Sequence, residues 1–189
     1  LAKKLGKNHQ LALDLWARDL HETRILASMV DVKTEVTDEQ MEAWAKDFHS
    51  WDLCDQVINN LFSYTALARD KVWQWCPREE EFVRRAGFVL IATMGVHEKK
   101  APDEEFLAYL PLIKEYATDK RNFVKKAVNW ALRQIGKRNM TLNAAALGCA
   151  YELADMDSAP ARWIAKDAIR ELEDEKIRAR IKRGSSAKN

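Results

Sequence analysis

Apolar residues recur every three or four positions through most of the chain, which is the spacing of amphipathic α-helices. Residues 79–96, "EEEFVRRAGFVLIATMGV", form a largely apolar segment that begins with acids, as helix N-termini favour. Thr37 stands three residues before Gln40 and predicts a capping box, while Ser50 and Ser158 each precede a periodic segment and predict further helix starts. No stretch alternates apolar and polar residues long enough to predict a strand. The pattern therefore predicts an all-α protein.

The predicted helices are short and joined by tight connections. Apolar residues within 11–15 and 25–30 mark the first two helices. The other predicted helices span residues 37–48, 51–62, 64–76, 79–96, 103–117, 122–136, 142–154 and 158–172. Helix-forming residues dominate the composition, whereas the chain has only 6 glycines and 4 prolines. This composition favours the same all-α assignment.

Two of these segments repeat one another. Residues 82–95, "FVRRAGFVLIATMG", align with residues 123–136, "FVKKAVNWALRQIG", at an offset of 41 positions, from 82 to 123. Residues 161–172 form a weaker third copy 38 positions further on, from 123 to 161. A period near 40 with two helices per unit is typical of HEAT-like solenoids, although chance similarity between amphipathic helices is the alternative. We expect a HEAT-like helical repeat solenoid, an α-α superhelix with a concave basic cleft. Its single domain would span residues 1–183, followed by a flexible tail at 184–189.

Composition narrows the class of protein. Hydrophobic residues make up 47% and charged residues 32% of the 189 residues, which is typical of a folded globular chain. No apolar run approaches the roughly 18 residues of a membrane span, so no membrane association is expected. The three cysteines are far apart and predict reduced thiols, hence an intracellular, cytoplasmic location. The four histidines lack metal-ligand spacing, and no Gly-rich phosphate loop or Ser-His-Asp arrangement is present. We expect no metal site and no cofactor.

The charges are unevenly distributed although the formal net charge is only +2. Residues 14–55 contain eleven acids and four bases, whereas residues 120–151 contain seven bases and no acid. Six more bases follow Glu175. Such blocks give part of the surface a positive potential and indicate a polyanionic partner. Ordinary solvated helix faces are the alternative, and for the C-terminal block both interpretations stay open.

One predicted helix places an indole among bases. Lys126, Trp130, Arg133 and Lys137 are spaced by four, three and four residues and therefore share one helix face, with no acid in the segment to neutralise them. An indole can hold a planar or cationic ligand, and Arg and Lys bind phosphates. Alternatively, Trp130 packs between repeats and the bases extend around it. Both interpretations remain open from the residues alone.

A second constellation combines an indole with a carboxylate. Trp51 and Asp55 lie four residues apart and share a helix face, which suits a site for a positively charged group. The same spacing suits a helix whose Trp belongs to the core and whose Asp meets an Arg of a neighbouring helix. Arg84 and Arg85 begin a repeat helix, and one of them is expected to face the same groove as the equivalent Lys125 and Lys126.

Four segments together resemble the AlkD-like family of DNA alkylation repair proteins, which are HEAT-repeat DNA glycosylases. They are "LWARDLHETRILASMV", "WDLCDQVINNLF", "EFVRRAGFVLIA" and "RNFVKKAVNWALRQIGKRN", in the family's order and at suitable spacing. The resemblance implies that Trp51, Asp55, Arg85, Trp130 and Arg133 line a DNA-binding cleft. Family members usually have several dozen residues before the segment that aligns with residues 11–20, whereas 10 precede it here.

The resemblance also implies an activity, which is hydrolysis of the N-glycosidic bond of cationic N3- or N7-alkylated purines in duplex DNA. Asp55 would be the catalytic carboxylate, and Trp51 and Trp130 would contact the lesion. The residues expected to bind the DNA backbone are Arg85, Lys126, Arg133 and Lys137. The expected partner is duplex DNA containing alkylated bases, bound by a monomer. A non-catalytic HEAT-like DNA-binding protein of the same superfamily is the alternative.

Overall fold

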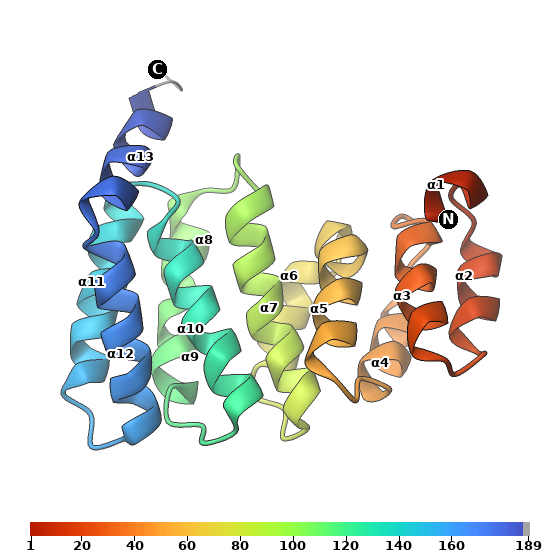
Figure 1. The fold of residues 1–189 in the computed structure, drawn as a ribbon, viewed down its shortest axis with the longest axis horizontal. Helices are drawn as coiled ribbons and strands as arrows, with labels where there is room; N and C mark the ends of the chain where they lie inside the picture. The colour runs from red at the N-terminus through yellow and green to blue at the C-terminus, as the bar shows by residue number, and fades with distance from the viewer. Residues whose placement is uncertain (187–189) are drawn as a thin grey trace. The chain divides into compact units, whose positions relative to one another are not determined.

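The computed structural model describes residues 1–186, and residues 187–189 of the predicted tail lie outside the described part. Every regular element in the described residues is helical, which confirms the all-α prediction (Figure 1). The chain divides into two compact units, Leu1–Leu90 and Ile91–Asn189, and each is described by itself. The predicted single-domain boundary at residue 183 stays a prediction.

The first unit contains six α-helices, a 3-10 helix and the start of a seventh α-helix. They are α1 (Ala2–Leu5), α2 (His9–Trp16), α3 (His21–Val30), α4 (Asp38–Lys46), α5 (Trp51–Asn60), η1 (Phe62–Tyr64), α6 (Ala68–Trp75) and α7 (Glu81–His97). The helix α7 ends in the second unit, where six more α-helices are described: α8 (Asp103–Ala108), α9 (Leu110–Tyr116), α10 (Asn122–Gly136), α11 (Met140–Ala154), α12 (Ala159–Leu172) and α13 (Glu175–Ser186).

The helix starts follow the predicted caps. The side chains of Thr37, Ser50 and Ser158 each accept a hydrogen bond from the backbone N–H three residues further on, at 3.1, 3.4 and 3.4 Å. These bonds satisfy one otherwise unpaired N–H at each helix start. The reciprocal half of the capping box at Thr37 is absent, since Gln40 Oε1 accepts no hydrogen bond from the described residues. The Gln40 amide instead donates from Nε2 to Asp31 Oδ2 at 2.6 Å.

Two predicted segments differ from the structure. The single helix expected over residues 103–117 is two helices, α8 and α9. Pro111 lies in the first turn of α9, where its missing N–H does no harm, but inside one continuous helix it would remove a backbone bond. At the other end of the chain, α13 extends to Ser186, so residues 184–186 of the predicted tail belong to a helix.

A row of buried aromatic rings forms the core of the first unit. The rings of Trp16 and Trp44 stack at 3.9 Å with 4° between their planes. Phe62 lies 5.9 Å from Trp44 and 6.2 Å from Trp75. All four side chains are buried. The row therefore joins α2, α4, η1 and α6 around one apolar centre.

Glycine permits close helix packing at one point of this unit. A Cβ on Gly87 of α7 would lie 2.8 Å from both the backbone nitrogen and Sγ of Cys76, at the end of α6. Gly148 of α11 is the opposite case, because a Cβ there would have no neighbour within 4 Å. Of these two glycines, only Gly87 is required by packing.

In the second unit, α10, α11 and α12 pack against one another, and α8 and α9 pack against α11. Arg138, just beyond α10, stabilises the end of α7. Its guanidinium donates to the carbonyl oxygens of Gly95, Glu98 and Ala101 at 3.0–3.1 Å and lies 3.9 Å from the centre of the Phe106 ring. This base therefore has a structural role in the folded chain.

Candidate nucleic-acid interface

Asp55 and Arg85 form a two-point ion pair between α5 and α7. Arg85 Nε donates to Asp55 Oδ1 at 2.9 Å, and Arg85 Nη2 donates to Asp55 Oδ2 at 2.8 Å. The side chains are 15% and 7% exposed for Asp55 and Arg85, respectively. Both carboxylate oxygens are thus held in one orientation by the parallel N–H groups of a single guanidinium.

Burial and the ion pair act in opposite directions on the Asp55 carboxyl. Burial raises its pKa above the ordinary value, the bonds and charge of Arg85 oppose that rise, and the nearby Asp52 adds to it. The net result is a raised pKa. Each carboxylate oxygen has lone pairs beyond the one that Arg85 uses, so Asp55 can still accept a hydrogen bond from a water or ligand at its exposed edge.

Trp51 begins α5, one turn before Asp55, and its side chain is on the surface. It is 52% exposed, in contrast to the fully buried Trp75. The interpretation of Trp51 as a core residue is therefore wrong, whereas a pairing of Asp55 with an Arg of a neighbouring helix is correct. Asp52, on the next helix position, lies 2.9 Å from the Nε2 atom of His21. An exposed indole thus stands beside a fixed carboxylate on the first unit.

The predicted basic face of the second unit lies on α10. Lys126 is exposed and Trp130 is half-buried. Trp130 is therefore neither a free surface residue nor part of the closed core. The Lys125 ammonium, next to Lys126 in the sequence, lies 4.5 Å from the centre of the half-exposed Trp163 ring on α12.

The expectation that no acid neutralises this face is wrong. Glu171 of α12 accepts hydrogen bonds from Lys137 Nζ at 2.7 Å and from Arg133 Nη1. Asp167 lies 3.6 Å from Arg133 and accepts a bond from the buried Asn129 at 2.7 Å. The acids come from a different helix, so the acid-free segment of the sequence is not acid-free in the fold.

These contacts join residues that are 38 positions apart, the offset of the third sequence repeat. The pairs are Lys125 with Trp163, Asn129 with Asp167, and Arg133 with Glu171. Each step of four residues along α10 meets a step of four along α12, which is one turn of each helix. The two repeat helices therefore lie in register, and the weaker third copy is a structural repeat.

The pKa values of the two acids reflect this pairing. Burial alone would raise the pKa of Glu171, but the bonds and charges of Lys137 and Arg133 lower it overall. Burial also acts to raise the pKa of Asp167, and the bond from Asn129 with the charges of Arg133 and Arg170 lowers it overall. Both acids are thus ionised and compensate the bases of α10.

The predicted site residues fall into two groups. Trp51, Asp55 and Arg85 lie together on the first unit, and the α10 residues lie together on the second. A single trough shared by both groups stays a prediction. Sequence reasoning missed Asp167, Glu171 and Trp163, although the 38-residue offset was the signal that aligns them with α10. In the described part of the chain, none of the helices has the length and apolar character to cross a membrane.

Comparison with known proteins identifies the family. The sequence model described as DNA alkylation repair enzyme matches residues 1–172. The chain belongs to the DNA alkylation repair enzyme family. A solved structure matches it with a TM-score of 0.73 and 19% identity, covering 89% of this chain and 77% of that one. That structure was described as a new family of proteins related to the HEAT-like repeat DNA glycosylases with affinity for branched DNA structures. The match confirms the predicted HEAT-like fold of the alkylation repair chain. No curated protein sequence matches at a significant level.

Proposed function

We propose that the protein is a DNA glycosylase that releases cationic N3- or N7-alkylated purines from duplex DNA. The observation that carries the proposal is that exposed Trp51 lies one helical turn from Asp55, which Arg85 holds by two bonds, in a chain of the alkylation repair family. The negative face of an indole attracts a cationic base, and an ionised carboxylate attracts the positive charge that develops on the sugar.

The reaction needs little from the protein beyond electrostatics. An alkylated purine carries a formal positive charge, and cleavage of its bond to C1′ leaves the bonding electron pair on the purine nitrogen, which neutralises the base. Positive charge then develops on the deoxyribose and is stabilised by the Asp55 carboxylate. Water supplies the oxygen that bonds to C1′, and its proton passes to Asp55 or to solvent. The products are a neutral free base and an abasic site.

Arg85 has a positioning role in this proposal. Its guanidinium is almost fully buried and directs two N–H groups at Asp55, which differs from the backbone contact suggested by the family resemblance. The pair keeps the carboxylate in one orientation and favours its ionised form. Because Arg85 offsets part of the negative charge of the Asp55 carboxylate, the edge of Asp55 that Arg85 does not contact stabilises the positive charge on the deoxyribose.

Asp55→Asn tests the proposal directly. The amide oxygen can still accept one bond from Arg85, so we expect a folded protein that binds DNA but releases N7-methylguanine at least about 10²-fold more slowly. Asp70→Asn is the matched control, because it removes the same charge from an exposed site on α6 of the same unit. Chromatography of free base from a duplex with one N7-methylguanine measures both. Equal release by wild type and Asp55→Asn would remove Asp55 from the mechanism.

A second candidate function is binding of branched DNA without base excision. It is favoured by the affinity of the structurally similar protein for branched DNA and by the partial neutralisation of Asp55 by Arg85. This function predicts that a four-way junction binds more tightly than a linear duplex of the same length. It also predicts that no abasic product forms from methylated DNA. The two measurements together separate the candidates.

A further inference from the structure

A hollow opens on the first unit near the end of α5, away from the start of that helix where Trp51 lies. It has a volume of about 400 Å³ and is formed by the α1–α2 connection, the α3–α4 connection, the end of α5 and η1. We call it the Tyr64 hollow. Its polar lining consists of Lys7, Lys33, Thr34, Asn60 and Tyr64, and the described residues that line it include no Asp or Glu.

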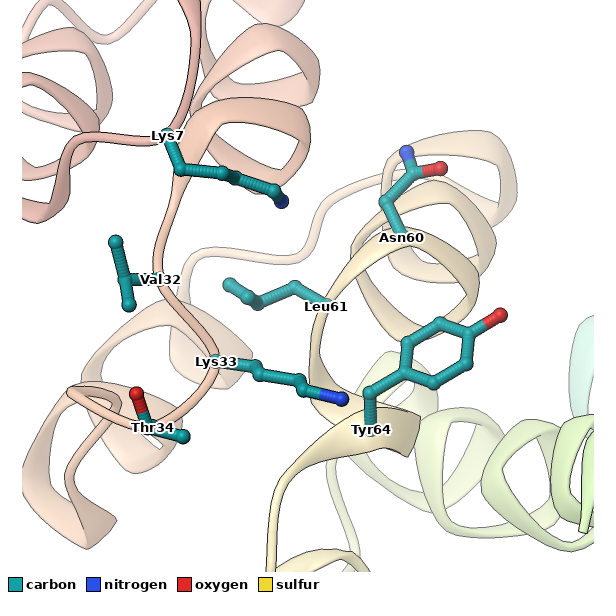
Figure 2. A pocket seen from close by; sticks show the side chains of 7 residues that line it. All are labelled: Lys7, Val32, Lys33, Thr34, Asn60, Leu61 and Tyr64. Carbon is teal, nitrogen blue, oxygen red and sulfur yellow. The ribbon is translucent and has the colours of Figure 1, made fainter.

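The two ammonium groups in the hollow are held in different ways. Lys7 Nζ donates to the carbonyl oxygens of Met29 and Asp31 at 3.0 and 2.9 Å, which fixes its position and leaves one of its three N–H groups for a ligand. Lys33 Nζ lies 5.9 Å from the centre of the Tyr64 ring. Figure 2 shows both lysine side chains extending into the space beside Leu61.

An anionic group attached to an apolar or planar body fits this lining. The ammonium groups and the Thr34 hydroxyl are hydrogen-bond donors for phosphate oxygens. The Tyr64 ring is 40% exposed and Leu61 forms an apolar wall, so a sugar or base can pack beside the phosphate. A nucleotide unit combines these chemical features, whereas an acidic peptide would leave the aromatic surface unused.

We propose that the Tyr64 hollow binds one nucleotide of the DNA strand outside the lesion, with its phosphate on Lys33 and Lys7 and its sugar against Tyr64. The inference rests on the proposed DNA-binding function. Asn60 at the hollow and Trp51 are nine positions apart on α5, which is about 13.5 Å along the helix at 1.5 Å per residue. For a duplex that runs parallel to α5, this rise corresponds to about four base pairs at 3.4 Å each, so the contacted nucleotide lies about four base pairs from the lesion.

Lys33→Gln tests the phosphate contact, and Lys46→Gln is its control because it removes the same charge from an exposed position on α4 of the same unit. Fluorescence anisotropy would give the affinity for a methylated duplex from 50 to 200 mM salt. We expect the slope of log affinity against log salt to be less steep by about 0.9 in Lys33→Gln and unchanged in Lys46→Gln. Between those salt concentrations, the wild type would lose about 3.5-fold more affinity than Lys33→Gln. An unchanged slope in Lys33→Gln overturns the proposal.

A second measurement locates the contacted phosphate. In a series of duplexes, one phosphate is replaced by a neutral methylphosphonate, one position further from the lesion in each duplex. The affinity of each duplex is measured for wild type and for Lys33→Gln. We expect one methylphosphonate linkage about four base pairs from the lesion to weaken DNA binding by wild type but not by Lys33→Gln, because the contact is already absent from the variant. Additive losses at every position overturn the assignment. Tyr64→Leu is expected to weaken DNA binding about fivefold, because the ring no longer packs against the sugar.

The source of the nucleotide is distinguished by titration with deoxyadenosine monophosphate. The proposal expects no binding at micromolar concentrations. Micromolar binding that is lost in Lys33→Gln, with an unchanged DNA salt slope, would assign the hollow to a free nucleotide and overturn the DNA contact. These outcomes are independent of glycosylase activity. If the wild type releases no base but Lys33→Gln alters the salt slope, the hollow stands as a DNA contact and only the proposed reaction fails.

Discussion

Glu171→Gln removes the acid that Arg133 and Lys137 share, while it keeps the size of the side chain. The Glu171 side chain is 21% exposed, and those of Arg133 and Lys137 are 26% and 16% exposed. Partly exposed ion pairs contribute about 0.2–1 kcal/mol each, so losing both pairs costs at most about 2 kcal/mol. Thermal unfolding measures this loss, and we expect Tm to fall by about 2–4 °C for each kcal/mol in a chain of this size.

DNA binding should change in the opposite direction. In the wild type, a phosphate that binds Arg133 or Lys137 must compete with Glu171, and the displaced carboxylate then takes up a cation from solution. Without that carboxylate, up to one more counterion is released in the net reaction, and the salt slope becomes steeper by up to about 0.9. The gain in affinity on going from 200 to 50 mM salt is then larger than in the wild type by up to about 3.5-fold.

Glu152→Gln is the matched control for this prediction. Glu152 pairs with Lys114 at 2.8 Å on the same unit, so the substitution makes the same change in net charge away from the α10–α12 register. Anisotropy titrations of an unmodified duplex over the same salt range measure the slopes. The reasoning is refuted if Glu171→Gln and Glu152→Gln have the same slope as the wild type, because the bases of α10 would then not contact phosphates.

Three further predictions follow from the geometry. Trp51→Ala should slow the release of alkylated base with little change in Tm, whereas Trp73→Ala, at a similarly exposed indole (48%), should change neither quantity. Equal effects of the two substitutions in both assays would refute a specific role for Trp51. Gly87→Ala should destabilise the protein by about 1–3 kcal/mol through overpacking, and Gly148→Ala should stabilise it by about 0.4–1 kcal/mol, with urea unfolding as the measurement and the opposite order as the contradiction. Base release should increase as the pH rises through the raised pKa of Asp55, because the carboxylate becomes ionised. The contribution of Asp55 to the free energy of unfolding is largest below its ordinary pKa and declines over the same rise in pH. A rate of base release that does not increase between about pH 4 and pH 7 would contradict the role of Asp55.

The helix pattern and the caps could be predicted from the sequence because both are local. Thr37, Ser50 and Ser158 act within three residues of themselves, and the spacing of Trp51 and Asp55 follows from one helical turn. The break between α8 and α9 also had a local signal in its proline, but the apolar spacing continued through it. Local signals therefore account for the starts of α4, α5 and α12 and for the break between α8 and α9.

Pairings between helices could not be predicted in the same way. Arg84 and Arg85 are adjacent and chemically alike, yet Arg85 turns to Asp55 while Arg84 donates to the carbonyl oxygen of Cys76 at 3.1 Å. Which of two neighbouring bases meets the carboxylate depends on the rotation of α7, and packing sets that rotation. The contact of Glu171 with Arg133 posed the same difficulty. The two residues are 38 positions apart, and this offset predicts a contact only if the third sequence repeat is known to be a structural repeat.

The three in-register contacts between α10 and α12 limit where an insertion or deletion is compatible with the fold. One residue inserted between Asn129 and Arg133 would rotate the two parts of α10 by about 100° relative to each other, so the contacts of Lys125, Asn129 and Arg133 with α12 could not all be kept. The same insertion in the turn that follows α11, at residues 155–158, would leave all three contacts intact. Variants with one added or deleted residue should therefore fold when the change lies in that turn and fail to fold when it lies between Asn129 and Arg133 of α10.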